Sequence, residues 1–244
     1  TVFHLAGIAH DFSDQTKATD RYQKLNIDAT LNLARNASQN GVKRFVYVSS
    51  VKATGLLNFA KCASEDIQGP FNGLYGKSKR EAEIQLLDLA KTVQMKIKIV
   101  RPALVYGPNV KGNLKTMQKW ISKGWFPPIP ETGNKRSMIH VDDLVRALIL
   151  IANCEDATGK ILNATDGRAY STREIFDQLC IASLKSIPSW RVPQIFLDIA
   201  KFISPSIKYK IEKLMCDEWH SSKNLEALGF VPLCSIEDIN RYVL

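Results

Sequence analysis

Residues 40–50 of the chain read NGVKRFVYVSS, and the fold class follows from this stretch. Asn40-Gly41 is the glycine ending expected of a helix, and the nearly continuous apolar run that comes after it is typical of a strand buried on both faces. A helix that turns directly into such a strand predicts part of a parallel sheet covered by helices.

The same alternation extends outward in both directions along the chain. Short runs rich in β-branched and aromatic residues are separated by longer segments of helical period. Strands are predicted at Val2–Ala6, Arg44–Ser49, Ile97–Arg101 and Met138–Val141, and helices near Asp20–Asn40 and Asn72–Gln94. This order predicts an α/β protein with a Rossmann-like, doubly wound parallel sheet.

The chain changes character after Pro102. Loops rich in glycine and proline surround one helix, and shorter helices fill the region from Ser171 onward, where Ser171 and Glu174 have the spacing of a capping box. This predicts a smaller, mainly helical C-terminal substrate lobe. The predicted boundaries are residues 1–102 plus about 138–155 for the Rossmann-like domain, and about 103–137 plus 156–244 for the lobe.

Composition limits the function classes. The 244 residues are 45% hydrophobic, and the longest apolar stretch, Ala147–Ala152, is far shorter than the roughly 20 residues that cross a membrane. The formal charge of +9 suggests an anionic partner, and nucleic acid, phospholipid headgroups and a diphosphate-bearing small molecule all satisfy it. The five cysteines are scattered, so we expect no metal site, no disulfide framework and a reduced, cytoplasmic setting.

One segment carries residues suited to proton transfer. Tyr75 and Lys79 are four residues apart at the start of a predicted helix and therefore share one face. A tyrosine has a reference pKa of about 10, and an adjacent ammonium lowers that pKa toward neutral pH, where the phenol can act as an acid or a base. The same spacing also occurs by chance on solvated helix faces, so the pair needs support from other residues.

That support comes from the second predicted strand. Ser49 and Ser50 leave its C-terminal end, the edge at which open α/β sheets bind ligands, and Ser50 can hydrogen-bond the substrate oxygen that Tyr75 protonates or deprotonates. Capping of the strand end explains either serine alone but not both together with Tyr75 and Lys79. The first strand ends in the small pair Ala6-Gly7, which a flat ring can approach closely and which an ordinary turn explains equally well.

Six motifs follow one another along the chain. They are His4-Leu5-Ala6-Gly7, Leu25-Asn26-Ile27-Asp28-Ala29-Thr30, Val48-Ser49-Ser50, Tyr75-Gly76-Lys77-Ser78-Lys79, Arg101-Pro102-Ala103-Leu104-Val105-Tyr106-Gly107-Pro108 and Arg136-Ser137-Met138-Ile139-His140-Val141-Asp142-Asp143. Taken in order, they resemble the extended short-chain dehydrogenases/reductases, in the NAD-dependent nucleotide-sugar epimerase/dehydratase branch that includes UDP-glucose 4-epimerase. The resemblance covers nearly the whole chain.

The resemblance implies roles for individual residues. It gives Ser50, Tyr75 and Lys79 as the catalytic group; Ala6, Gly7, Asn26, Ser49, Tyr75, Lys79 and Pro102 around NAD, with NADP as the alternative; and Ser50, Asn113 and Arg136 against the sugar nucleotide. Arg136 also has a reason of its own, because a guanidinium grips a diphosphate through paired hydrogen bonds, although a solvated loop charge explains it as well. We further expect a UDP-sugar or related sugar diphosphate as substrate, a homodimer and no nucleic-acid partner.

The sequence departs from this family at one place. The Gly-x-x-Gly-x-x-Gly turn whose backbone amides meet the cofactor's pyrophosphate does not occur among the 13 glycines. The first strands and the glycine-rich loop are then missing, which predicts an N-terminally truncated chain. We expect the 244 residues alone to be inactive.

The implied reaction removes a proton from a sugar hydroxyl through Tyr75 while a hydride leaves C4. Return of the hydride to the opposite face makes a UDP-hexose or UDP-N-acetylhexosamine 4-epimerase, and net use of reduced cofactor makes a UDP-4-ketosugar 4-reductase, in either case serving polysaccharide or lipopolysaccharide synthesis. A dehydratase is disfavoured, because Val51-Lys52 stands where that branch has an acidic pair. Two rivals stay open, namely a hydroxysteroid-like alcohol dehydrogenase and a non-catalytic dinucleotide-sensing protein.

Residues Arg191–Lys213 combine apolar and basic side chains. Such a pattern fits contact with a membrane surface, and it also fits helices of the substrate lobe that pack inward. Inward packing is the favoured interpretation, and Pro205 interrupts any single long helix there.

Overall fold

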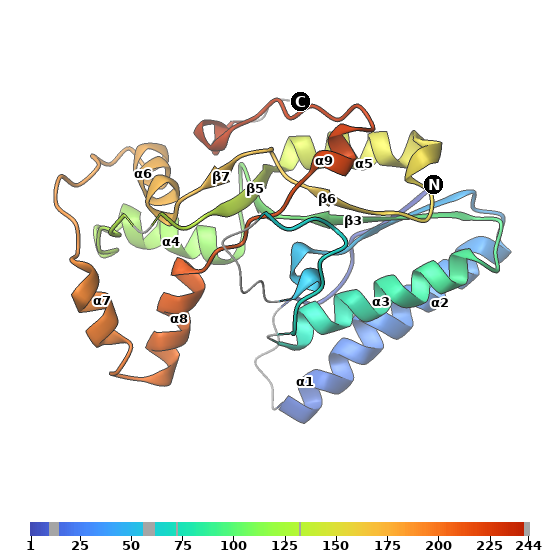
Figure 1. Cartoon of the computed structure of the whole chain (residues 1–244), viewed down its shortest axis with the longest axis horizontal. Coiled ribbons are helices and arrows are strands. Elements are labelled where there is room, and N and C mark those ends of the chain that lie inside the picture. Colours follow the sequence, from blue (N-terminus) through green and yellow to red (C-terminus); the bar gives the residue numbers. More distant parts are fainter. Residues whose placement is uncertain (10–14, 56–61, 72, 132, 242–244) are drawn as a thin grey trace.

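The computed structural model describes residues 1–9, 15–55, 62–71, 73–131 and 133–241. Its main sheet has four parallel strands in the order β1-β2-β3-β6. The strands are β1 (Val2–His4), β2 (Arg44–Val48), β3 (Lys96–Pro102) and β6 (Ile161–Ala164). Helices cover both faces of the sheet (Figure 1), which confirms the predicted Rossmann-like α/β fold.

One face of the main sheet is covered by the helices that precede β3. They are α1 (Gln15–Tyr22), a π-helical segment (Gln23–Asp28), α2 (Ala29–Gln39) and α3 (Leu74–Ala90). The first three run as one continuous helical stretch, and α2 packs beside α3 (Figure 1). Small side chains such as Ala34 and Ala82 are fully buried between these helices and the sheet, which allows close packing.

A buried ion pair ties α3 to β3. Arg101 donates from Nε and Nη2 to the two carboxylate oxygens of Glu83 at 2.9 and 2.7 Å, and both side chains are 1% exposed. A further donation reaches the carbonyl oxygen of Glu65 at 3.3 Å. Because both charges lie out of water, each depends on its partner.

The opposite face of the main sheet is covered by α5 (Val141–Asn153). Lys98 of β3 is fully buried, and its Nζ donates to the carbonyl oxygens of Ile151, Ala152 and Cys154 at 2.9, 2.9 and 2.7 Å. The last carbonyls of a helix lack partners within the helix. Lys98 therefore closes the C-terminal end of α5 from inside the sheet.

A second, smaller sheet consists of β4 (Leu104–Tyr106), β5 (Arg136–His140) and β7 (Ala169–Tyr170). The strand predicted at Met138–Val141 belongs to this sheet and not to the main one, whereas residues 161–164, assigned to the lobe, form the fourth strand of the main sheet. An apolar pattern shows that a strand is buried but not which sheet it joins. The predicted domain boundary therefore leaves β6 on the wrong side.

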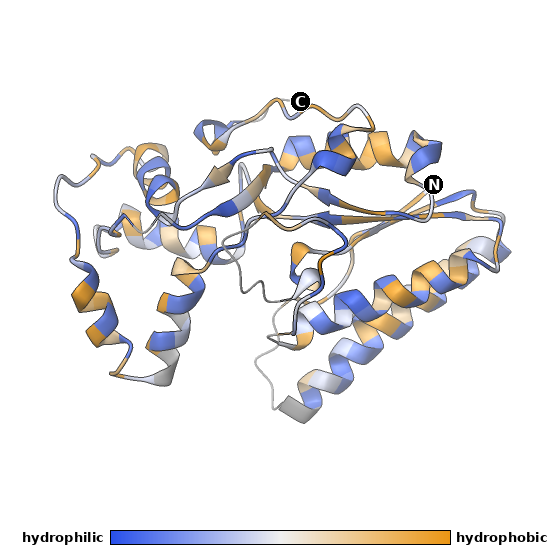
Figure 2. Ribbon diagram, viewed as in Figure 1, coloured by the Kyte–Doolittle hydropathy of each residue, from blue (hydrophilic) through white to orange (hydrophobic). Residues whose placement is uncertain are grey.

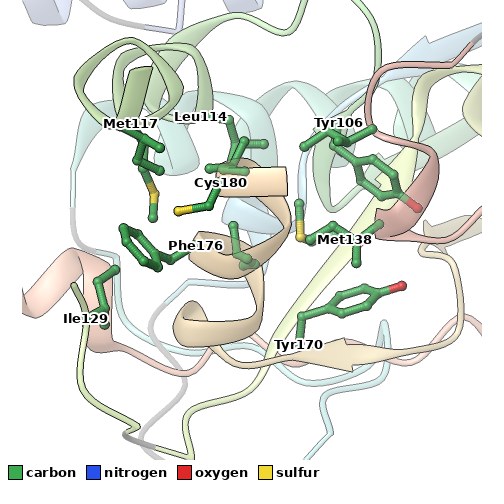
Figure 3. Close-up of a cluster of buried hydrophobic side chains, with 13 residues drawn as sticks. Tyr106, Leu114, Met117, Ile129, Met138, Tyr170, Phe176 and Cys180 are labelled. Atoms are coloured by element: carbon green, nitrogen blue, oxygen red, sulfur yellow. The ribbon is translucent and has the colours of Figure 1, made fainter. Parts of the chain in front are cut away.

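The second sheet and two helices enclose the core of the lobe. The helices are α4 (Gly112–Ser122) and α6 (Thr172–Ala182), and the capping box predicted at the start of α6 is present. Figure 3 shows Leu114 and Met117 of α4 facing Phe176 and Cys180 of α6, with Met138 of β5 beside them. This cluster gives the lobe its own buried core.

The remaining helices are α7 (Gln194–Ala200), α8 (Pro205–Met215) and α9 (Lys223–Glu226), of which α9 packs on β6 of the main sheet. There are 3₁₀ turns at Val51–Thr54, Glu155–Ala157 and Ile236–Asp238. α7 and α8 project away from both sheets (Figure 1), and no residue of α7 is buried. The inward packing predicted for this region is thus wrong for α7, because only the end of α8, through Leu214 and Met215, reaches the core. Within the described part of the chain, every helix is too short or too polar to cross a bilayer.

Candidate active site

Ser50 lies where the chain leaves the C-terminal end of β2. Its Oγ accepts a hydrogen bond from the backbone N–H of Lys52 at 3.2 Å and so begins the 3₁₀ turn Val51–Thr54. The first turn of α3 packs directly on this turn: a Cβ at Gly76 would come within 2.4 Å of the Lys52 carbonyl oxygen. Only glycine allows α3 to approach the end of β2 so closely.

Tyr75 lies in that first turn of α3, close enough to the Ser50 hydroxyl for the two groups to interact. Burial raises the pKa of the Tyr75 phenol, while the neighbouring Ser50 hydroxyl opposes this rise and nearby Tyr22 adds to it. The net shift is upward, which is opposite to the lowering expected from the Lys79 ammonium. Tyr75 is therefore protonated at neutral pH.

Lys79 lies one helical turn after Tyr75 and is buried. Its Nζ donates to the carbonyl oxygen of Val48 at 3.0 Å and lies 4.8 Å from the centre of the Tyr47 ring. Burial lowers the pKa of Lys79 to about 8, and the carboxylate of Glu83 acts in the opposite direction. The amine is thus fixed at the carboxyl end of β2, the strand that leads to Ser50.

Asn26 lies in the π-helical segment and is buried. Its Oδ1 accepts from the backbone N–H of Ile8 at 2.8 Å, and its Nδ2 donates to the Ile8 carbonyl oxygen and to Ser78 Oγ, each at 3.0 Å. Ser78 in turn donates to the Tyr75 carbonyl oxygen at 2.8 Å. One amide therefore joins the segment after β1 to the helix that carries Tyr75.

The remaining residues predicted around a cofactor gather at the same edge of the sheet. Ala6 and Gly7 are exposed just after β1, and a Cβ at Gly7 would stand 3.4 Å from Lys79 Nζ. Ser49 is buried, and its Oγ has no hydrogen-bond partner in the described structure. Pro102 ends β3, the neighbour of β2. The edge thus combines an open backbone, a free hydroxyl and a fixed amine.

Arg136, the predicted diphosphate ligand, lies at the start of β5 with its guanidinium partly engaged. Nη1 donates to the carbonyl oxygens of Lys213 and Leu214 at 3.0 and 3.3 Å, and Nη2 donates to Glu218 Oε2 at 3.2 Å. Nε is buried and has no partner among the described residues. The group is therefore held in place with one donor left over.

Sequence reasoning missed the second cation at this position. The Lys52 ammonium pairs with Glu218, the same carboxylate that pairs with Arg136. Burial, together with the nearby Arg136, lowers the pKa of Lys52 to about 8. Glu218 lies 166 positions after Lys52, and no motif in the sequence marks it. Two cations from two elements thus converge on one carboxylate.

Asn113 lies apart from these groups. It is exposed in the first turn of α4, which packs against α6 in the lobe. Among the described residues, no hydrogen bond joins Asn113 to Ser50, Tyr75 or Arg136, and no cluster of three His, Cys, Asp or Glu side chains could hold a metal ion. The structure therefore assembles most, but not all, of the predicted site.

Comparison with known proteins agrees with this geometry. The model of the NAD dependent epimerase/dehydratase family matches residues 1–165. The chain belongs to this family. A UDP-glucose 4-epimerase of Vibrio cholerae is 37% identical over 79% of this chain and 59% of its own length. An N-acetyl-alpha-D-glucosaminyl-diphospho-ditrans,octacis-undecaprenol 4-epimerase of Escherichia coli O157:H7 is 27% identical over 76% of this chain and 56% of its own.

Solved structures of other proteins share the fold. A UDP-glucuronic acid 4-epimerase from Bacillus cereus in complex with NAD superimposes with a TM-score of 0.76 at 19% identity, covering 97% of this chain and 70% of that one. RMD from Pseudomonas aeruginosa, complexed with NADPH, gives 0.75 at 19% identity, covering 97% and 78%. The chain spans less than three fifths of the length of the curated epimerases it matches.

NAD is the cofactor of this family. The edge formed by Gly7, Ser49 and Lys79 suits a flat ring that carries hydrogen-bonding groups at its periphery. The backbone at Gly7 is exposed, and the missing Cβ would stand 3.0 Å from Asn26 Oδ1 and 3.4 Å from Lys79 Nζ. The unpartnered Ser49 hydroxyl and the fixed amine of Lys79 offer hydrogen bonds at its rim. When bound, NAD supplies the acceptor and donor of a hydride.

Proposed function

We propose that the protein interconverts the C4 epimers of a nucleotide-activated sugar, a UDP-hexose or UDP-N-acetylhexosamine. The observation that carries this proposal is the placement of the Tyr75 phenol beside the Ser50 hydroxyl at the carboxyl end of β2, one helical turn from the fixed amine of Lys79. The names of the Vibrio and Escherichia relatives share a 4-epimerase activity, which supports C4 as the reacting carbon.

In this proposal Tyr75 moves the proton and Ser50 orients the sugar. The raised pKa of Tyr75 keeps its phenol protonated, the form that donates to a 4-keto oxygen. The Ser50 hydroxyl stabilises the phenolate by donating to it, so the reverse step, removal of the proton from the C4 hydroxyl, becomes accessible. Ser50 is also within reach of the same sugar oxygen.

The proposed cofactor residues are Ala6, Gly7, Asn26, Ser49, Tyr75, Lys79 and Pro102. Ser49 and Lys79 would hold the nicotinamide half by hydrogen bonds, while Asn26 fixes the open backbone through Ile8. The side chains of Ala6 and Pro102 would offer only apolar contact. NADP stays an alternative, because no side chain that would contact the adenosine ribose, and so distinguish NAD from NADP, is identified among the described residues.

The proposed substrate residues other than Ser50 are Arg136 and Asn113. Arg136 would bind the diphosphate through its guanidinium, with Lys52 as a second cation beside it. A doubly charged diphosphate competes with Glu218 for both groups. Asn113 would have to reach the nucleotide from α4. A homodimer and a place in polysaccharide or lipopolysaccharide sugar supply are further parts of the proposal.

Replacement of the phenol tests the proton-transfer step. Tyr75→Phe in the native protein is expected to slow interconversion of UDP-sugar epimers by about 10²–10⁴-fold, because the proton carrier is lost. The matched control is Tyr209→Phe, which removes an exposed phenol on α8 and should leave the rate unchanged. Retained activity in Tyr75→Phe would contradict the proposal.

Cofactor balance separates epimerase from reductase. An epimerase brings the two UDP-sugar epimers to equilibrium without net consumption of NADH. Chromatography measures the ratio of the two epimers. Net consumption of NADH with a 4-ketosugar would show the reductase instead. Absence of inhibition by free UDP would favour an alcohol dehydrogenase of the hydroxysteroid-like kind.

A further inference from the structure

An exposed apolar arm extends from the lobe. It consists of residues 184–215 and includes α7 and α8. Phe202 and Ile203, at the end of the arm between the two helices, are 91% and 70% exposed. Exposed apolar side chains in such number on one short segment mark an interaction surface.

The apolar residues of the arm lie on one side of α7 and its continuation. Ile195, Ile199, Phe202 and Ile203 have the i, i+4, i+7, i+8 spacing of a single helical face, and all four are exposed. Figure 2 shows this helix as a succession of orange bands. The arm thus presents an amphipathic helix whose apolar face has no partner within the described structure.

The arm is held firmly at its base. The backbone N–H of Val192 donates to the Pro128 carbonyl oxygen at 3.1 Å, and Leu214 packs against the core of the lobe. Thr172 Oγ1 donates to the Leu214 carbonyl oxygen at 2.6 Å. The apolar face is therefore presented in a fixed direction and is not part of a loose tail.

Charge identifies the partner. Residues 184–215 contain six basic and two acidic residues, a net charge of +4. The two acids, Asp198 and Glu212, are each already paired with a lysine of the arm. Two copies of a surface with this charge repel each other. A bilayer with anionic headgroups provides both an apolar acyl-chain region and negative charge.

We propose that this arm docks on the surface of an anionic lipid bilayer, with the apolar side chains of α7 and of residues 202–203 inserted at the headgroup boundary and the lysines against the headgroups. The bound protein lies on the membrane and does not span it. This proposal is independent of the reaction at Tyr75.

Vesicle sedimentation with the native protein tests the proposal. We expect binding to vesicles of phosphatidylcholine with 30% phosphatidylglycerol at about tenfold higher affinity than to phosphatidylcholine alone, weakened by added salt. Phe196→Ser with Phe202→Ser should reduce binding to the anionic vesicles by about tenfold or more. The urea-unfolding midpoint of this double variant should match that of the native protein, which reports that it is folded.

The control replaces two exposed apolar side chains elsewhere. Val231→Ser with Leu233→Ser, each 62% exposed and outside the arm, should leave vesicle binding unchanged. No binding of the native protein to anionic vesicles, or equal loss in the control, would overturn the proposal. Self-association that disappears in the arm variant, without vesicle binding, would show a second copy as the occupant instead.

Discussion

Gly76 is the residue on which the position of Tyr75 depends most directly. Gly76→Ala places a methyl group 2.4 Å from the Lys52 carbonyl oxygen, so α3 and the turn after Ser50 must separate. We expect the free energy of unfolding, measured in urea, to fall by about 1–3 kcal/mol. The loss of catalytic rate, expressed as a free energy of activation, should be larger than this loss of stability. The control Lys77→Ala changes the neighbouring exposed position and should alter stability by no more than about 0.5 kcal/mol. An unchanged Gly76→Ala variant would show that the turn adjusts freely.

Lys79 makes stability depend on pH. Its pKa is about 8 in the folded protein, below the ordinary 10.5, because burial disfavours the ammonium. Between pH 8 and 10.5 the unfolded chain binds the proton that the folded chain has lost, so this residue makes stability rise with pH, by about 3 kcal/mol across that window. Lys79→Met should remove that rise.

The measurement is the difference between two titrations. Urea unfolding of the native protein and of Lys79→Met is followed at pH 7.5, 9 and 10.5, and contributions from cysteines and tyrosines cancel when the slopes are subtracted. Equal slopes in the two proteins would contradict the depressed pKa.

Among the elements, α3 has the strongest link to the sheet through the pair Arg101–Glu83. Glu83→Gln leaves the Arg101 guanidinium buried without its counter-charge, and we expect a loss of about 3–5 kcal/mol in urea unfolding. Glu81→Gln, on the same helix and bonded only to Gln85 in the described structure, should cost less than about 1 kcal/mol. A double variant with Met at both 83 and 101 should recover much of the lost stability. Equal losses in Glu83→Gln and Glu81→Gln would show that the pair is not what anchors α3.

The elements that follow a local rule could be predicted from the sequence. Helical period and strand runs gave α3, β2 and β3 to within a few residues, because each rests on neighbours in the chain. The single helix predicted near Asp20–Asn40 is divided in the structure into α1, the π-helical segment and α2. No local sequence pattern predicts the π-helical segment around Asn26. Its geometry is set by the contacts of that amide with Ile8 and Ser78, one of them 52 positions away.

At the scale of the whole molecule, the sequence predicted the edge where chemistry takes place but not everything that meets there. Ser50 and Tyr75 could be placed together because strand ends and helix starts converge at one edge of a parallel sheet. The pairing of Glu218 with Lys52 and Arg136 could not, since it depends on how the C-terminal segment returns across β5. The sheet that each strand joins was likewise decided by distant pairing, as β6 shows.

The π-helical segment between α1 and α2 has a consequence for how the chain can vary. A π-helical turn needs more residues than an α-helical one, so the helices on its two sides are out of phase with each other. Loss of one residue from this stretch would restore a uniform helix and turn Asn26 by about 100° away from Ile8. Evolution can therefore exchange side chains along the outer surface of Gln15–Gln39 far more freely than it can change the length of this segment.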